Sequence, residues 1–119
     1  MRTETDPAIS MNARLRAPGV LGKVLDAGAD GSLAVVGRSV SWTQGGALQW
    51  SVAAAAVHVE ALPSTLHYDL VLRVGDEDWP FIVDDRPIRT FTRGLLVARR
   101  RRDAAITLLR WIEYSKQSV

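Results

Sequence analysis

The sequence contains no cysteine, and only two of its 119 residues are histidine. Without thiols, disulfides, thiolate zinc sites, iron–sulfur clusters and cysteine nucleophiles are excluded. No stretch approaches the roughly 18 uninterrupted apolar residues of a membrane-spanning helix, and the first residues lack the apolar core of a signal peptide. We therefore predict an intracellular protein without a transmembrane segment, in which any metal site would need histidine and carboxylates.

Charge is distributed unevenly along the chain, although the formal net charge is only +2. Residues 60–85 carry seven acidic side chains against one arginine, whereas residues 86–110 carry eight arginines against one aspartate. A chain of this length has room for a single hydrophobic core, so these two segments must pack close together. We expect their charges to be partly compensated, and the remainder to steer charged partners.

The pattern predicts a short leader followed by one domain over residues 19–119. Residues 1–18 are polar, contain two prolines and show no sustained period, which is typical of a flexible leader. From residue 19 to residue 83, apolar and polar residues alternate between turn signals, as they do in half-buried strands. A first strand is expected over residues 20–27. Turns or irregularities are predicted over residues 27–32, at Gly37 as a bulge, over residues 43–46, within residues 53–56 and over residues 75–78.

The clearest predicted strand covers residues 66–74, and a short final strand contains Trp79, Phe81 and Val83. Side chains of successive strand residues point to opposite faces of a sheet. In residues 66–74 this alternation places Leu66, Tyr68, Leu70, Leu72 and Val74 inward, and His67, Asp69 and Arg73 outward.

Beyond residue 85 the apolar spacing becomes that of an amphipathic helix. The favoured helix runs from about Pro87 to about Ser115, with Asp85 as its cap and Pro87 in its first turn. Alternatively, Asp103 caps a shorter helix, and residues 86–98 form a loop or a further strand. Six or seven antiparallel strands followed by one C-terminal helix make an α+β fold. By their phase, Trp42, Trp50, Trp79 and Trp111 are predicted to lie mostly in the core.

Two histidine–carboxylate pairs, His58 with Glu60 and His67 with Asp69, are expected on the outward face of neighbouring strands. Such a set is permitted for a metal ion. Any half-buried strand shows the same alternation, however, so we expect an exposed polar row without metal or cofactor. No Ser–His–Asp order, phosphate-binding glycine loop or zinc motif occurs, and we predict that the protein is not an enzyme.

Four consecutive arginines, residues 99–102, precede the strongest part of the helical stripe. On a helix they spread around the cylinder, so at most two or three can face one ligand. No aromatic residues are interleaved to stack bases. We favour a solvated helix end over an anion site.

Four stretches resemble a known domain family. "DGSLAVVGRSVSW" is similar to the second and third strands of GRAM-like domains, and "LQWSVAAAAVHVEAL" to the apolar strand and small kink that follow. "LVLRVGDEDWPFIVDD" and "RDAAITLLRWI" resemble the last strands and the closing helix. The chain therefore resembles a pleckstrin-homology-like (PH-like) domain. Within that family it looks like the amino-terminal domain of the sixty-two-kilodalton core subunit of TFIIH, the general transcription and nucleotide-excision-repair factor.

The resemblance implies a barrel or sandwich of two near-orthogonal sheets, closed by the C-terminal helix. It implies a non-catalytic interaction module that docks acidic, aromatic-containing segments of transcription or DNA-repair partners in a multisubunit complex. The location would then be the nucleus, and otherwise the cytoplasm. Arginines after the last strand would pair with carboxylates while an apolar side chain enters a shallow pocket. The candidate partner-binding residues are His58, His67, Asp69, Arg73, Trp79, Arg86, Arg89, Arg93, Arg99, Arg100, Arg101 and Arg102.

Two other ligands are alternatives. An anionic phospholipid needs a basic cluster in the first hairpin, where Lys23 and Arg38 stand against Asp26 and Asp30. Nucleic acid would bind through the arginine-rich helix.

Overall fold

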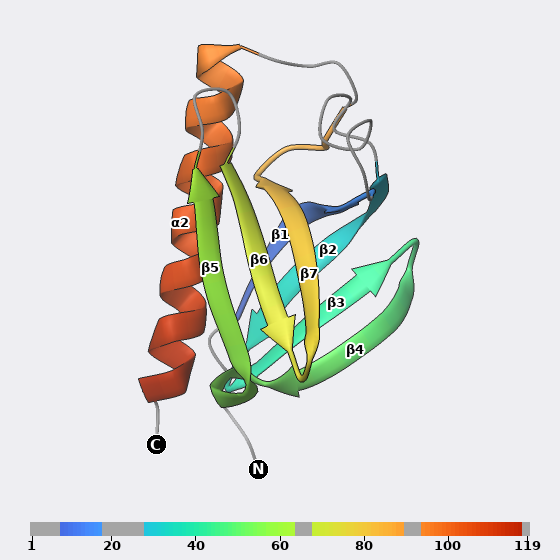
Figure 1. Cartoon of the computed structure of the whole chain (residues 1–119), viewed down its shortest axis with the longest axis vertical. Coiled ribbons are helices and arrows are strands. Elements are labelled where there is room, and N and C mark those ends of the chain that lie inside the picture. The colour runs from blue at the N-terminus through green and yellow to red at the C-terminus, as the bar shows by residue number, and fades with distance from the viewer. Residues whose placement is uncertain (1–7, 18–27, 64–67, 90–93, 118–119) are drawn as a thin grey trace.

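Among the residues that the structure describes, seven antiparallel strands form one sheet, and one long helix packs against it (Figure 1). The computed structural model describes residues 8–17, 28–63, 68–89 and 94–117. The strand order is β4-β3-β2-β1-β7-β6-β5, so the α+β prediction is confirmed. The elements are β1 (Ala8–Arg16), β2 (Gly28–Val36), β3 (Ser39–Gln44), β4 (Ala47–Ala53), the 3-10 turn η1 (Ala54–Ala56), β5 (Val57–Pro63), β6 (Tyr68–Val74), β7 (Glu77–Asp84) and α2 (Leu95–Gln117).

Tight turns between the strands are set by glycines with positive φ. The β3–β4 turn uses Gly45 and Gly46, at φ 56° and 84°, a combination that suits two-residue hairpins and that side chains disfavour. The turns predicted over residues 43–46 and 75–78 are therefore confirmed. At Gly37 the bulge prediction is wrong, because Gly37 and Arg38 form a hairpin turn between β2 and β3. The alternation of apolar and polar residues shifts at Gly37 because the chain reverses direction there. The irregular strand pairing lies instead between Trp42 and Thr43, where the register of β3 with β4 shifts.

Strand β1 occupies the middle of the sheet, which corrects the flexible leader predicted over residues 1–18 where it covers residues 8–16; residues 1–7 and 18 lie outside the described residues. It pairs with β2 along its whole length and with β7 over residues 12–15. Its inward residues include Ala13, Leu15 and Met11, a period-2 pattern hidden by small and charged neighbours. The turn predicted over residues 27–32 is also wrong, because residues 28–32 belong to β2. The strand expected over residues 20–27 lies outside the described residues.

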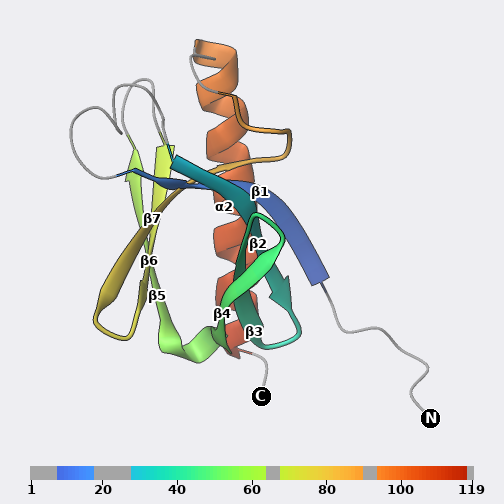
Figure 2. The same cartoon turned by 90° about the vertical axis from the view of Figure 1, so that its right-hand side faces the viewer.

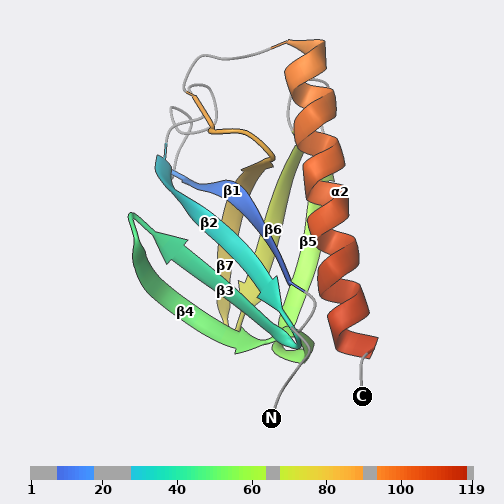
Figure 3. The same ribbon diagram turned by 180° about the vertical axis from the view of Figure 1, so that it is seen from behind.

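The sheet bends strongly between its two halves, so that β5, β6 and β7 cross the direction of β2, β3 and β4 (Figure 2). It is not closed, because β4 and β5 lie at opposite ends of the strand order. The barrel implied by the resemblance therefore describes it only loosely. The helix lies beside the bend and contacts both halves (Figure 3). The largest fully buried side chains, which mark the core, are Trp42, Phe81, Leu33, Leu70, Leu72, Ile82, Leu108 and Ile112.

The tryptophans confirm the predicted core positions. Trp42 is fully buried and meets Phe81 edge to face, with ring centroids 4.7 Å apart. Trp50 and Trp79 are half-buried and meet each other in the same way at 5.9 Å. Trp111 packs half-buried against the core from the helix.

The helix begins at Leu95, later than the favoured start near Pro87 and earlier than a start capped by Asp103. Gly94 precedes it at φ 136°, and the Ala98 amide donates to the Gly94 carbonyl at 3.0 Å. Both alternatives are wrong: residues 85–89 are not helical, and Asp103 lies inside the helix. Ile88 is buried from this non-helical segment, which explains why its spacing imitates a helical stripe. At the other end, Ser115 Oγ donates to the Gly37 carbonyl at 2.6 Å and ties the helix to the β2–β3 turn.

Candidate functional site

The four consecutive arginines point in different directions around α2. Arg99 and Arg102 are exposed, Arg100 is half-buried and Arg101 is 6% exposed. Successive helix residues are separated by about 100° around the axis, so a run of four cannot form one surface. The four arginines are therefore divided between solvent and the interior, in line with the prediction that at most two or three could face one ligand.

The two inner arginines bind Asp84, the last residue of β7, which is fully buried. Arg100 donates from Nε and Nη2 to the two carboxylate oxygens of Asp84, at 2.7 and 2.9 Å. Arg101 Nε donates to Asp84 Oδ2 at 3.2 Å, and the Arg86 amide donates to Oδ1 at 3.2 Å. This Asp84 clamp fixes the start of α2 to the end of β7, and it confirms that the acidic and basic segments partly compensate each other.

Opposing effects set the pKa of the Asp84 carboxyl. Burial raises the pKa, but hydrogen bonds, led by those from Arg100, outweigh it and hold the pKa below its ordinary value. The hydrogen bond to Asp84 also raises the pKa of Arg100. The pair is therefore ionised at neutral pH.

Acid is expected to weaken the fold through Asp84. A carboxyl whose folded-state pKa lies below its unfolded-state pKa stabilises the fold above the unfolded-state value, and this stability is lost as pH falls through the folded-state value. We expect the free energy of unfolding to drop below about pH 4, the ordinary aspartate range. Urea unfolding at a series of pH values measures it. The Asp84→Asn variant, already weaker, should show a shallower acid limb; an equally steep limb would assign the effect to other carboxyls.

Two further arginines, Arg14 and Arg16 on β1, are nearly buried ion-pair partners that sequence reasoning missed. Arg14 Nη2 donates to Asp30 Oδ2 at 3.0 Å and to the Ile88 carbonyl at 2.9 Å. Arg16 donates to both carboxylate oxygens of Asp69, at 2.7 and 2.8 Å. The signal that would have found them is the alternation of residues 9–16, with Arg14 and Arg16 on the face opposite Ala13 and Leu15.

The described members of the outward row predicted on β5 and β6 do not gather into one cluster. His58 and Glu60 are exposed, Asp69 is held by Arg16, and His67 lies outside the described residues. Within the described part of the chain, no group of three histidine or carboxylate side chains is placed to hold a metal ion.

Two other members of the predicted set have partners within the domain. Arg73 is exposed and bound to Asp78, with Nε and Oδ1 2.8 Å apart. Their hydrogen bond raises the pKa of Arg73 and lowers that of Asp78. Trp79 faces inward against Trp50. The structure therefore does not bring Arg73 and Trp79 together as contact residues.

Exposed arginines gather instead at the end of the molecule where α2 begins. Arg86, Arg89 and Arg99 form no ion pair with a described residue. Arg102 Nε lies 3.8 Å from Asp103 Oδ1. Residues 84–89 and 94–103 hold six arginines against three aspartates, a net charge of +3. The acidic β6–β7 turn lies at the opposite end (Figure 1). Arg93 lies outside the described residues.

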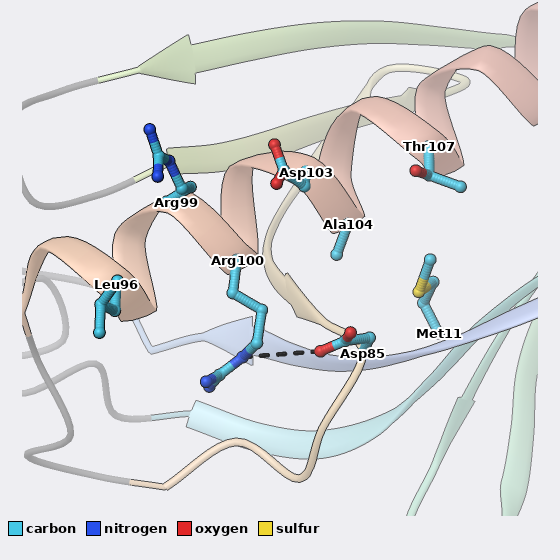
Figure 4. Close-up of a pocket in the computed structure, with 8 residues that line it drawn as sticks. All are labelled: Met11, Asp85, Leu96, Arg99, Arg100, Asp103, Ala104 and Thr107. Atoms are coloured by element: carbon cyan, nitrogen blue, oxygen red, sulfur yellow. Dashed lines mark ion pairs between the residues drawn. The ribbon is translucent and has the colours of Figure 1, made fainter.

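A groove of about 320 Å³ opens beside this basic end, between one face of α2 and β1. Figure 4 shows Met11 of β1 opposite Ala104 and Thr107 of the helix. Asp85 lies on the β1 side of the groove and its Oδ1 is 3.5 Å from Arg100 Nε. The lining residues are Met11, Asp85, Leu96, Arg99, Arg100, Asp103, Ala104 and Thr107.

Comparison with known proteins does not assign the chain to a family. No protein-family model, curated protein or solved structure matches the chain. Of the described helical residues, no stretch combines the length and apolar character needed to cross a membrane.

Proposed function

We propose that the chain is a non-catalytic, PH-like interaction module that docks an acidic segment of a partner protein at the end where α2 begins. The observation that carries this proposal is the set of exposed arginines, Arg86, Arg89 and Arg99, which have no ion-pair partner among the described residues. Its PH-like part is supported by seven antiparallel strands followed by one helix. The more specific proposal, that the partner acts in transcription or DNA repair, rests on the sequence resemblance to the TFIIH subunit.

The chemistry of these side chains suits carboxylates. An arginine guanidinium offers a planar fork of donors that matches a carboxylate in a two-point contact. The net charge of +3 in this region attracts an acidic segment before contact and raises the association rate. Such contacts remain solvated, so binding should be fast and should weaken as salt rises.

Titration of an acidic, aromatic-containing transactivation-type peptide into the isotope-labelled chain tests the proposal. We expect amide shifts over residues 86–89 and 95–103, and a loss of affinity between low and physiological salt. Replacing Arg86, Arg89 and Arg99 together by Gln should weaken binding about tenfold or more, because each charge-assisted pair contributes to affinity.

The matched controls are two exposed arginines elsewhere, Arg38 in the β2–β3 turn and Arg110 on the outer part of α2. Replacing both by Gln should leave affinity within about twofold, since neither lies at the basic end. Shifts confined to the termini, or an equal loss in the control variant, would contradict the proposal. Measuring the binding of the same protein to anionic vesicles and to duplex DNA distinguishes this function from lipid or nucleic-acid binding.

A further inference from the structure

On the side that faces β7, residues 8–11 of β1 are not paired with that strand. β1 meets β2 over residues 8–16, but it meets β7 only over residues 12–15. β7 ends at Asp84, opposite Asn12, and the chain then turns away into residues 85–89. Residues 8–11 therefore pair with no described strand on the β7 side. An unpaired strand edge offers a row of backbone donors and acceptors to another extended chain.

The groove between α2 and β1 meets this open edge at Met11, which lines it. In Figure 4 the helix runs above β1, and Met11 points across the gap toward the helix. The apolar lining comes from Met11, Ala104 and Leu96, of which Leu96 is 79% exposed. The charged lining includes both arginines and aspartates, and Arg99 forms no ion pair with a described residue. A volume of about 320 Å³ accommodates a few side chains, not a folded domain.

We propose that this groove takes an extended segment of the partner by strand addition to residues 8–11 of β1. The added strand would lie in line with β7, beyond the point at which β7 ends at Asp84. A large apolar side chain of the segment would lie against Met11 and Ala104, while a carboxylate of the segment faces Arg99. Backbone pairing supplies affinity and the apolar contact supplies selectivity.

The open edge selects a polypeptide over other ligands, because a row of amides and carbonyls is satisfied by another extended backbone and not by a lipid headgroup. The bound segment is acidic because the groove adjoins the region of net charge +3. This inference rests on the proposed function, since the same segment is attracted by the arginines at the start of α2. It adds where the segment lies and in what conformation.

Thr107→Trp tests the groove without touching the core or the arginines, because Thr107 is exposed and lines the gap. We expect it to weaken binding of the same acidic peptide about tenfold, by filling the space. Gln117→Trp is the matched control, an exposed neutral position on the last turn of α2, and should bind within about twofold of the unmodified chain. Thermal unfolding of both variants verifies that they are folded.

Hydrogen exchange of the unmodified chain gives a second readout that needs no variant. Peptide binding should slow the exchange of amides within residues 8–11 at least about tenfold, as new backbone bonds form. If the peptide binds but these amides stay unprotected and Thr107→Trp binds normally, strand addition is wrong and the proposed function stands. If no acidic peptide binds, both are wrong. Protection of residues 8–11 that rises with the concentration of the chain alone would assign the edge to a second copy and overturn the proposal.

Discussion

A chain that lacks residues 1–17 is expected to be unfolded under conditions in which the full chain folds. The truncation removes β1, the strand that joins β2 to β7. Without it, the sheet separates into β4-β3-β2 and β7-β6-β5, and two inner edges lose their backbone partners. Three-stranded pieces of this size bury too little apolar surface to offset the entropy of ordering the chain.

The loss reaches beyond hydrogen bonds along the strand. Ala13 is buried in the core, and Arg14 and Arg16 neutralise Asp30 and Asp69. Deleting them leaves Asp69, whose side chain is 17% exposed, without its bound guanidinium. An ion-pair partner removed from a mostly buried site is strongly destabilising, because the remaining charge stays desolvated.

Far-ultraviolet circular dichroism and urea unfolding measure the effect. The truncated chain should show no cooperative transition. A synthetic peptide of residues 8–17 added in excess should restore the strand signal, because it supplies the missing central strand. A truncated chain that unfolds cooperatively by itself would contradict the central position of β1.

Asp84→Ala is expected to lower the free energy of unfolding by about 3–5 kcal/mol, the cost of breaking a buried ion pair by removing one partner. Asp84 is fully buried and bridges two arginines of α2 to the end of β7. Its removal leaves the guanidinium of Arg101, with a side chain 7% exposed, without that carboxylate. The start of α2 then loses its attachment.

Urea unfolding compares this variant with Asp78→Ala, which breaks the pair to Arg73 where both side chains are about half exposed. The Asp78 variant should be nearly neutral, because water already screens that pair. Replacing Arg101 by Met in the Asp84→Ala background should recover part of the loss, since it removes a buried charge that has lost the Asp84 carboxylate. Equal effects of the two aspartate variants would show that burial of Asp84 does not matter.

Local pattern was sufficient to predict much of the second half of the sheet. In β6 and β7, Leu70, Leu72, Phe81 and Val83 recur at every second position, and all four are buried. The glycine pair at residues 45 and 46 predicts its hairpin because side chains disfavour positive φ. These are local constraints, which a single sequence carries in full.

Features that depend on distant contacts were not predicted. β1 was missed because its outward residues include two arginines whose partners, Asp30 and Asp69, lie far along the chain. The start of α2 was misplaced because Ile88 is buried by tertiary packing from a non-helical segment. The clamp on Asp84 could not be assigned, since the helix length decides which arginines face inward. The same absence of register information hides the open edge of β1.

The position of β1 has a consequence for how the chain reaches its fold. Its partner β2 follows within the next 20 residues, but its other partner, β7, begins at Glu77. The contacts from Arg14 to Ile88 and from Gly37 to Ser115 span 74 and 78 residues. Pairings of such separation pay loop-closure entropy first and slow folding. During synthesis, β1 and β2 are therefore made long before β7, and residues 12–15 of β1 lack their β7 partners until residue 84 has emerged.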